Sequence, residues 1–264
     1  MKHLGTIAAV AGLLLQVGAA HAISFAPPRP IVPTAVEDPS GERTAGLTLG
    51  LAAASWDQPD QTIRDSAGTL LGAIEFGTQV RPVITAEYRV NDTWSLGCWY
   101  NFVSWDTVLH PVAAPSSVVA ADASVDGGIY ELHVTRDFPG KNRWDLSAQL
   151  GFQHTKYEGS YRVATVGQGI QTQKFEYESQ QAVAWGLGTY KIPGARENAP
   201  SFGLMGGLGL SQRLKGEGSA TQAHLLLGAS AAFTPTISAT ASMWLVDLTD
   251  DSLARFTAGV TGRF

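Results

Sequence analysis

Several carboxylates and histidines stand where they could share a site that activates water. They are Asp106, His110, His154, Asp247, Asp250 and Asp251. A histidine held beside a carboxylate can act as a general base toward a water molecule, which is the chemistry of a hydrolase. His154 could also serve a nucleophilic lipid hydrolase, but no partner serine can be assigned to it. We therefore assign no catalytic residue and keep hydrolysis as the alternative to a non-enzymatic role.

A second set of ionisable residues alternates with apolar residues inside candidate strands. It consists of Arg81, Glu87, Arg89, Glu131, His133, Asp137, Asp145, Arg213 and Arg255. Both signs occur in comparable number, so we expect these side chains to pair in a polar interior rather than to line a path for solutes or ions. His133 could relay protons, but no second histidine lies at metal-ligand spacing from it. The sequence predicts no metal site and no cofactor.

The elements that must position these residues are β-strands. In residues 77–90, Val80, Ile84 and Tyr88 share one face, whereas Arg81 and Arg89 share the other. Such period-two alternation recurs in ten segments. They are 44–56, 77–90, 94–106, 127–138, 144–157, 176–191, 202–214, 220–233, 236–248 and 253–264. Pro82 interrupts the second segment and requires either a bulge or a later start of pairing, which leaves eight or twelve strands as neighbouring counts.

The connections fall into two classes by length. Those at 91–93, 139–143, 193–201 and 234–235 are mostly tight turns, whereas those at 57–76, 107–126 and 158–175 are predicted to be long loops. Short turns on one side and long loops on the other are typical of an outer-membrane barrel with a lipid-facing apolar surface and a polar lumen.

Aromatic residues cluster at the ends of the segments beside the short turns. They are Tyr88, Trp94, Phe138, Trp144, Phe202 and Phe233. This placement predicts an aromatic girdle at one membrane boundary. In the alternation of its strand, Arg136 also falls on the lipid-facing side. It lies two residues from Phe138, at the strand end near the membrane boundary, where an exposed cation costs only about 0–1 kcal/mol.

The N-terminus is predicted to be a signal peptide, residues 1–22, with cleavage before Ile23. Lys2 supplies a positive charge, an apolar stretch runs from Ile7 to Leu15, and 20–22 fit the cleavage pattern. Residues 23–43 are rich in proline and are expected to form a periplasmic arm, or else to enter the lumen. Residues 44–264 are expected to form the barrel.

Composition narrows the functional classes. The net charge is −5 and becomes −6 once Lys2 is removed, which argues against a nucleic-acid partner. The single cysteine, Cys98, cannot form an internal disulfide. No run of eighteen apolar residues occurs after the signal peptide, so only a soluble fold or a closed barrel is expected.

The last twelve residues, 253–264, end on an aromatic and place Phe256, Val260 and Phe264 on one face. This segment resembles the terminal strand of bacterial outer-membrane β-barrel proteins, which the barrel-assembly machinery recognises. The resemblance implies an all-β, transmembrane, antiparallel up-and-down barrel with outer-membrane lipid and lipopolysaccharide as its surroundings.

The expected function is a non-enzymatic one, in envelope structure, surface interaction with an unidentified extracellular partner, or narrow porin-like passage. The alternative is an outer-membrane hydrolase, either a protease of the omptin type or a lipid-A-modifying enzyme, that uses residues at the external rim. A soluble periplasmic β-protein is the third possibility, and it predicts recovery without detergent.

Overall fold

The computed structural model describes residues 46–56, 61–64, 70–76, 79–111, 118–138, 143–165, 169–192, 201–216, 221–234, 236–246 and 253–264. The predicted signal peptide and the proline-rich arm lie outside these residues. Among the residues that the structure describes, no helix is long and apolar enough to cross a membrane.

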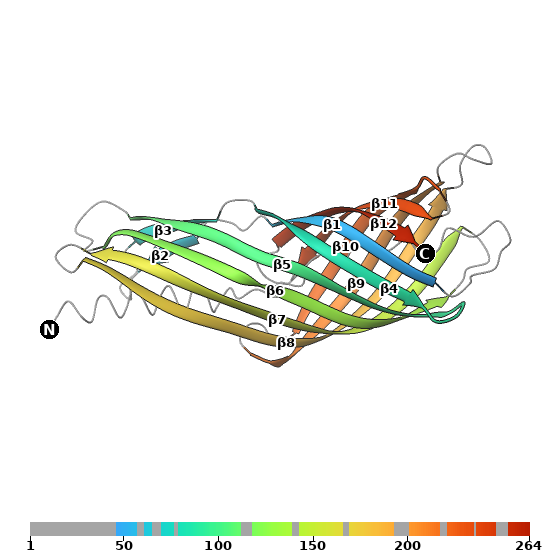
Figure 1. Ribbon diagram of the computed structural model, residues 1–264, viewed down its shortest axis with the longest axis horizontal. Helices are drawn as coiled ribbons and strands as arrows, with labels where there is room; N and C mark the ends of the chain where they lie inside the picture. The colour runs from blue at the N-terminus through green and yellow to red at the C-terminus, as the bar shows by residue number, and fades with distance from the viewer. Residues whose placement is uncertain are drawn as a thin grey trace.

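Twelve strands form one antiparallel sheet (Figure 1). They are β1 (Gly46–Trp56), β2 (Gln61–Arg64), β3 (Leu70–Phe76), β4 (Gln79–Arg89), β5 (Trp94–Pro111), β6 (Val118–Phe138), β7 (Trp144–Thr165), β8 (Gly169–Ile192), β9 (Ser201–Lys215), β10 (Thr221–Ala232), β11 (Ile237–Val246) and β12 (Leu253–Arg263).

Ten of these strands close into a barrel. The order runs β5-β4-β1-β12-β11-β10-β9-β8-β7-β6, and pairing of β6 with β5 closes the circle. Closure leaves no free edge within the barrel wall, as a lipid environment requires. The first and last strands meet through Leu47 and Phe264, whose backbone groups exchange hydrogen bonds of 3.2 and 2.8 Å. The predicted ten-stranded, all-β barrel is therefore confirmed.

Pro82 does not shorten its strand, β4. It lies opposite Ala53 of β1, while the pairing of β4 with β5 begins one residue later, at Val83. Where this ladder is interrupted, the Arg81 Nε donates to the backbone oxygen of Ser104 at 2.7 Å. A side chain thus satisfies an acceptor on β5, and β1 holds the proline segment in place.

The outer surface of the barrel carries an apolar belt of constant height. The outward-facing run extends from Trp94 to Phe102 in β5, from Tyr130 to Phe138 in β6 and from Trp144 to Phe152 in β7, nine residues in each strand. Nine to eleven tilted residues are what a strand needs to cross a bilayer. All six aromatic residues predicted for the girdle are 40–53% exposed on this surface.

Four strands continue well past the belt, which corrects the predicted loops. Residues 107–111 extend β5, 118–126 begin β6, 158–165 extend β7 and 169–175 begin β8, while β2 and β3 form a hairpin within 57–76. The β3 strand pairs with the far end of β5, through Phe76 opposite Thr107. In Figure 1 this external sheet reaches away from the short strands of the barrel. These segments form strands because each pairs with its neighbour through a backbone ladder.

Candidate functional site

The inward-facing polar residues gather on β4 to β7, near the short-turn end. The side chains of Arg89 and Asp137 are only 10% and 4% exposed, and Arg89 Nη2 lies 3.0 Å from Asp137 Oδ2. Beside them, the Ser95 hydroxyl donates to Glu87 at 2.5 Å. The Arg89 guanidinium also reaches the backbone oxygen of Asp92 at 3.4 Å. Buried charges in this part of the barrel therefore have opposite charges or polar atoms beside them.

Glu131 is the centre of the next layer of the interior. Its carboxylate accepts a hydrogen bond of 2.9 Å from the Gln149 amide and lies 3.2 Å from the His133 Nδ1. The His133 ring covers Gly97 of β5, and a Cβ on that glycine would overlap the ring. Gly97 thus makes the room that lets the histidine approach the carboxylate.

Two further predicted interior residues pair or pack within the wall. Asp145 lies 2.7 Å from the ammonium group of Lys191 on β8. Arg255 is 1% exposed, and its guanidinium carbon lies 5.8 Å from the centre of the Trp244 ring. Arg213 is half-buried toward the external end of β9.

An aromatic and apolar filling completes the interior on the other side of the barrel. Trp185, His224 and Trp244 contact one another with ring centres 5.2–5.7 Å apart. The His224 Nε2 lies 2.9 Å from the Ser211 hydroxyl. The sequence pattern did not identify this cluster. His224 and Leu226 are two residues apart on β10 and therefore lie on the same, inward face of that strand.

At mid-height the interior is filled by side chains. Asn101, Ile129 and Gln153 are each 0% exposed. Nearer the external end, the rings of Tyr157 and Tyr177 stack with centres 4.6 Å apart and lie in the same buried cluster as Ile129. A barrel of about this size has an interior that side chains just fill, and this one follows that rule.

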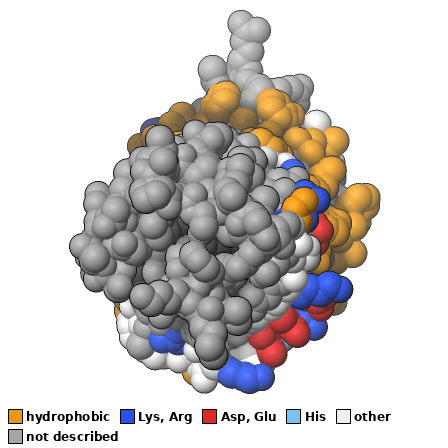
Figure 2. Space-filling model, turned by 90° about the vertical axis from the view of Figure 1, so that its left-hand side faces the viewer, with side chains coloured by type: hydrophobic (Ala, Val, Ile, Leu, Met, Phe, Trp, Pro, Cys, Tyr) orange, Lys and Arg blue, Asp and Glu red, His pale blue; other side chains and the backbone are white. Residues whose placement is uncertain are grey.

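The outer surface changes from apolar to charged just above the belt. Lys156 Nζ lies 3.0 Å from Glu176, and Lys215 Nζ lies 3.2 Å from Glu178. The hydrogen bond with Glu176 raises the pKa of Lys156, and the hydrogen bond with Lys215 lowers the pKa of Glu178. Seen from the external end, Figure 2 shows charges of both signs gathered on one side next to hydrophobic side chains. This band marks the upper boundary of the belt.

Two of the rim residues considered for hydrolysis, Asp106 and His154, lie far apart. His154 faces outward, where its ring stacks on Tyr130 at 5.0 Å and its Nε2 lies 3.9 Å from Glu178. Across β6, Asp106 lies opposite Ser124 and His154 opposite Tyr130, which separates their backbones by roughly 20 Å along the sheet. Asp106 and His154 therefore do not form a water-activating pair. The carboxylates at 247, 250 and 251 lie outside the described residues.

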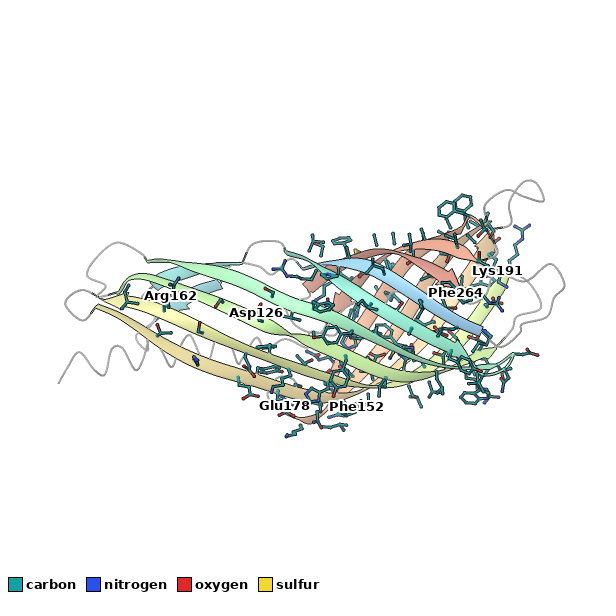
Figure 3. All side chains as sticks on the ribbon, in the orientation of Figure 1. Asp126, Phe152, Arg162, Glu178, Lys191 and Phe264 are labelled. Atoms are coloured by element: carbon teal, nitrogen blue, oxygen red, sulfur yellow. The ribbon has the colours of Figure 1, made fainter. Side chains whose placement is uncertain are left out.

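The two ends of the molecule are well separated. Figure 3 shows Asp126 and Arg162 on the external sheet, Phe152 and Glu178 at its base, and Phe264 toward the opposite end. The residues predicted as an assembly signal, Phe256, Val260 and Phe264, are 52%, 55% and 79% exposed on the outer surface. They are available to a partner during membrane insertion, and that role stays a prediction.

The edge of the external sheet is the remaining notable surface. The β8 strand pairs with β9 only from Gln180 onward, so among the described residues its 169–179 segment pairs with β7 alone. Unpaired backbone donors and acceptors on such an edge can add a further strand.

Comparisons with known proteins agree on the fold. No protein-family model matches the chain, and no curated protein matches its sequence. Among solved structures, the chain is similar to the transport unit of the autotransporter AIDA-I from Escherichia coli, with 12% identity, a TM-score of 0.54, and 97% of this chain and 98% of that one covered. It is also similar to the translocator domain of the autotransporter NalP from Neisseria meningitidis, with 12% identity, a TM-score of 0.55, and 85% and 91% covered. The β domain of the Bordetella autotransporter BrkA gives 15% identity, a TM-score of 0.52, and 84% and 100% covered. The closed barrel, its apolar belt and these likenesses together show that the chain has the fold of the bacterial outer-membrane β-barrels.

Proposed function

We propose that this protein is a non-enzymatic barrel of the bacterial outer membrane that presents a β-sheet to partners outside the cell. The main support for this proposal is the external sheet, in which β6, β7 and β8 continue for more than ten residues past the belt. Strands of this length are not needed to cross a bilayer. An extended, regularly paired sheet is what the described part of this end of the molecule offers to a partner.

The open 169–179 edge of β8 is the proposed contact. A partner peptide in extended conformation would bind there by adding a strand, with main-chain hydrogen bonds supplying the affinity. Lys174 and Glu176 stand exposed on the outer face beside this edge. Charged residues on an edge strand discourage indiscriminate pairing, so they favour a partner of complementary sequence over aggregation.

Prolines on this edge test the proposal. Successive backbone N–H groups of a strand point in opposite directions. Of the two variants Thr172→Pro and Gln173→Pro, one therefore removes an N–H donor on the open edge. The other removes an N–H donor that faces β7. Cells of a Gram-negative host displaying the full chain are tested for adhesion to immobilised extracellular-matrix proteins and to one another. We expect adhesion, and its loss with the open-edge proline while the protein stays at the cell surface. Absence of adhesion by the unaltered chain, or full adhesion by both proline variants, would contradict the proposal.

The barrel itself is proposed to be closed to solutes. The complete burial of Asn101, Ile129 and Gln153 supports this, because a wide aqueous channel would leave inward side chains exposed. The purified protein should give no conductance steps in planar bilayers. Discrete steps would instead favour a narrow pore. The same burial argues against a translocation role, which the names "transport unit" and "translocator domain" give to two of the autotransporter neighbours.

Export through a cleaved signal peptide completes the proposal. The mature protein should be recovered with the outer-membrane fraction, and N-terminal sequencing should begin at Ile23. Recovery in the soluble fraction without detergent would overturn the membrane location.

A further inference from the structure

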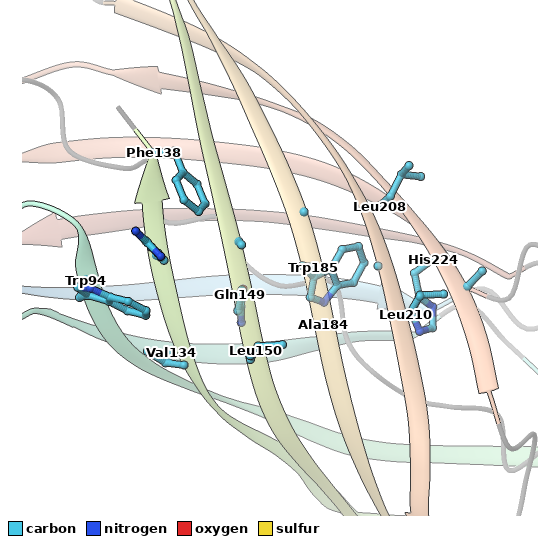
Figure 4. Close-up of a pocket in the computed structure, with 15 residues that line it drawn as sticks. Trp94, Val134, Phe138, Gln149, Leu150, Ala184, Trp185, Leu208, Leu210 and His224 are labelled. Atoms are coloured by element: carbon cyan, nitrogen blue, oxygen red, sulfur yellow. The ribbon is translucent and has the colours of Figure 1, made fainter. Parts of the chain in front are cut away.

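A groove of about 730 Å³ crosses the outer surface of the barrel wall over β6 to β9. Its floor is made by the small residues Ala148, Ala184 and Gly186. Figure 4 shows Trp94, Val134 and Phe138 toward one end of the groove and Leu208 and Leu210 toward the other. Large apolar side chains border this stretch, which is therefore a hollow in a surface that faces hydrocarbon.

The strand register turns the small residues into a continuous track. Arg136 lies opposite Ala148, Ala148 opposite Gly186, and Gly186 opposite Leu208. With neighbouring strands about 4.8 Å apart, this row measures roughly 14 Å from Arg136 to Leu208, of which roughly 10 Å, from Ala148 to Leu208, is apolar. A narrow apolar track of this length is suited to an extended hydrocarbon chain rather than to a globular partner.

Arg136 stands at one end of the track with its charge held in place. Its guanidinium carbon lies 5.5 Å from the centre of the Trp94 ring and 5.1 Å from that of Phe138. The side chain is exposed on the outer surface. Within the described part of the chain, no carboxylate lies at ion-pair distance from it. A fixed cation beside an apolar track has the charge that an anionic lipid headgroup would complement.

We propose that this groove binds a phospholipid of the periplasmic leaflet, with the phosphate on Arg136 and an acyl chain along the row from Ala148 to Leu208. The proposal rests on the location in the outer membrane proposed above. Phe138 ends its strand beside the short connection at 139–143, and short turns lie on the periplasmic side of such barrels. The periplasmic leaflet consists of phospholipid, whereas the phosphates of lipopolysaccharide lie at the other boundary.

Filling the groove provides the first test. A Cβ on Gly186 would meet no atom within 4 Å, so Gly186→Leu can occupy the track without disturbing the wall. The matched control is Gly206→Leu, an outward glycine outside the groove whose Cβ would make only ordinary contacts at 3.9 Å. The purified full-length protein in micelles is irradiated with phosphatidylglycerol carrying a photoactivatable acyl chain. We expect crosslinks on β6 to β9 that fall several-fold in Gly186→Leu and stay unchanged in the control.

Removing the charge provides the second test. An arginine near anionic lipid strengthens binding about five-fold, so Arg136→Gln should lower crosslinking by about that factor. Arg143→Gln, at the same end of the barrel but outside the groove, should leave it unchanged. Crosslinking by a photoactivatable diacylglycerol, which lacks phosphate, should be insensitive to both changes.

Heat-modifiable migration on gels shows whether each variant is folded. Crosslinks spread evenly around the barrel, equal crosslinking of the two leucine variants, or better competition by lipopolysaccharide than by phospholipid would each overturn the lipid site. If these results occur in a protein that still fractionates with the outer membrane and still adheres through its external sheet, only the lipid site fails.

Discussion

The Arg89–Asp137 pair allows a quantitative test of how the interior is stabilised. At 3.0 Å the attraction between the two charges is about 5.5 kcal/mol for an effective dielectric constant of 20. Folding has already removed both groups from water, since their side chains are 10% and 4% exposed. The change Asp137→Asn removes the partner charge and leaves the guanidinium buried. We therefore expect the free energy of unfolding to fall by about 3–5 kcal/mol.

The measurement is equilibrium unfolding in urea, with the protein folded into lipid vesicles and followed by tryptophan fluorescence. Lys156 and Glu176 supply a matched control, because their charged atoms are also 3.0 Å apart but the side chains are 52% and 58% exposed. Glu176→Gln should have little effect, since water screens a surface pair and solvates the cation left behind.

A double-mutant cycle separates pairing from other effects of the substitution. Arg89→Gln, alone and together with Asp137→Asn, should give a coupling free energy of about 2 kcal/mol or more. A loss below about 1 kcal/mol in Asp137→Asn, or additive single changes, would refute the view that buried pairs of opposite charge hold the lumen together.

Three further outcomes follow from the geometry. Gly97→Ala should lower the free energy of unfolding in urea by about 1–3 kcal/mol, because its Cβ would displace the histidine ring that covers it. Gly186→Ala should be close to neutral, and equal losses in the two variants would contradict this packing. The pKa of Glu178 is lowered by Lys215, so this pair stabilises the fold above the ordinary carboxyl pKa and the contribution is lost as the pH falls. The urea midpoint of the unaltered protein should therefore decline more steeply on acidification than that of Lys215→Gln, and parallel curves would argue against it. Phe264→Ala should reduce the amount of folded barrel in cells while leaving refolding into detergent intact, and unchanged cellular assembly would remove the proposed signal role.

Alternation within a strand was enough to predict the barrel wall. In β4, Val80, Ile84 and Tyr88 are 49–58% exposed while Arg89 is buried, as their parity indicates. Lipid outside and a packed interior inside impose opposite preferences on successive side chains, so the pattern is strong wherever the strand crosses the membrane. Parity also placed Arg136 on the outer surface.

Contacts between strands were less predictable because they depend on register. Arg89 and Asp137 were both expected inside, but only the shared pairing of β4 and β6 with β5 brings them to one level of the barrel. The groove is a stronger example, since its row joins Arg136, Ala148 and Gly186 from three strands. No local signal in the sequence indicates that these small residues adjoin.

The external sheet shows why the same pattern failed beyond the belt. Residues 158–165 continue β7 although they are mostly small or polar, because hydrogen bonds to β6 and β8 replace the missing apolar pattern. Beyond the belt the outer face of a strand no longer contacts lipid, so the alternation weakens and a paired strand can resemble a loop in its composition. The strand segments beyond the belt, which the sequence pattern did not predict, also extend further than a bilayer crossing requires. For this physical reason we place the proposed interaction with a partner on these segments.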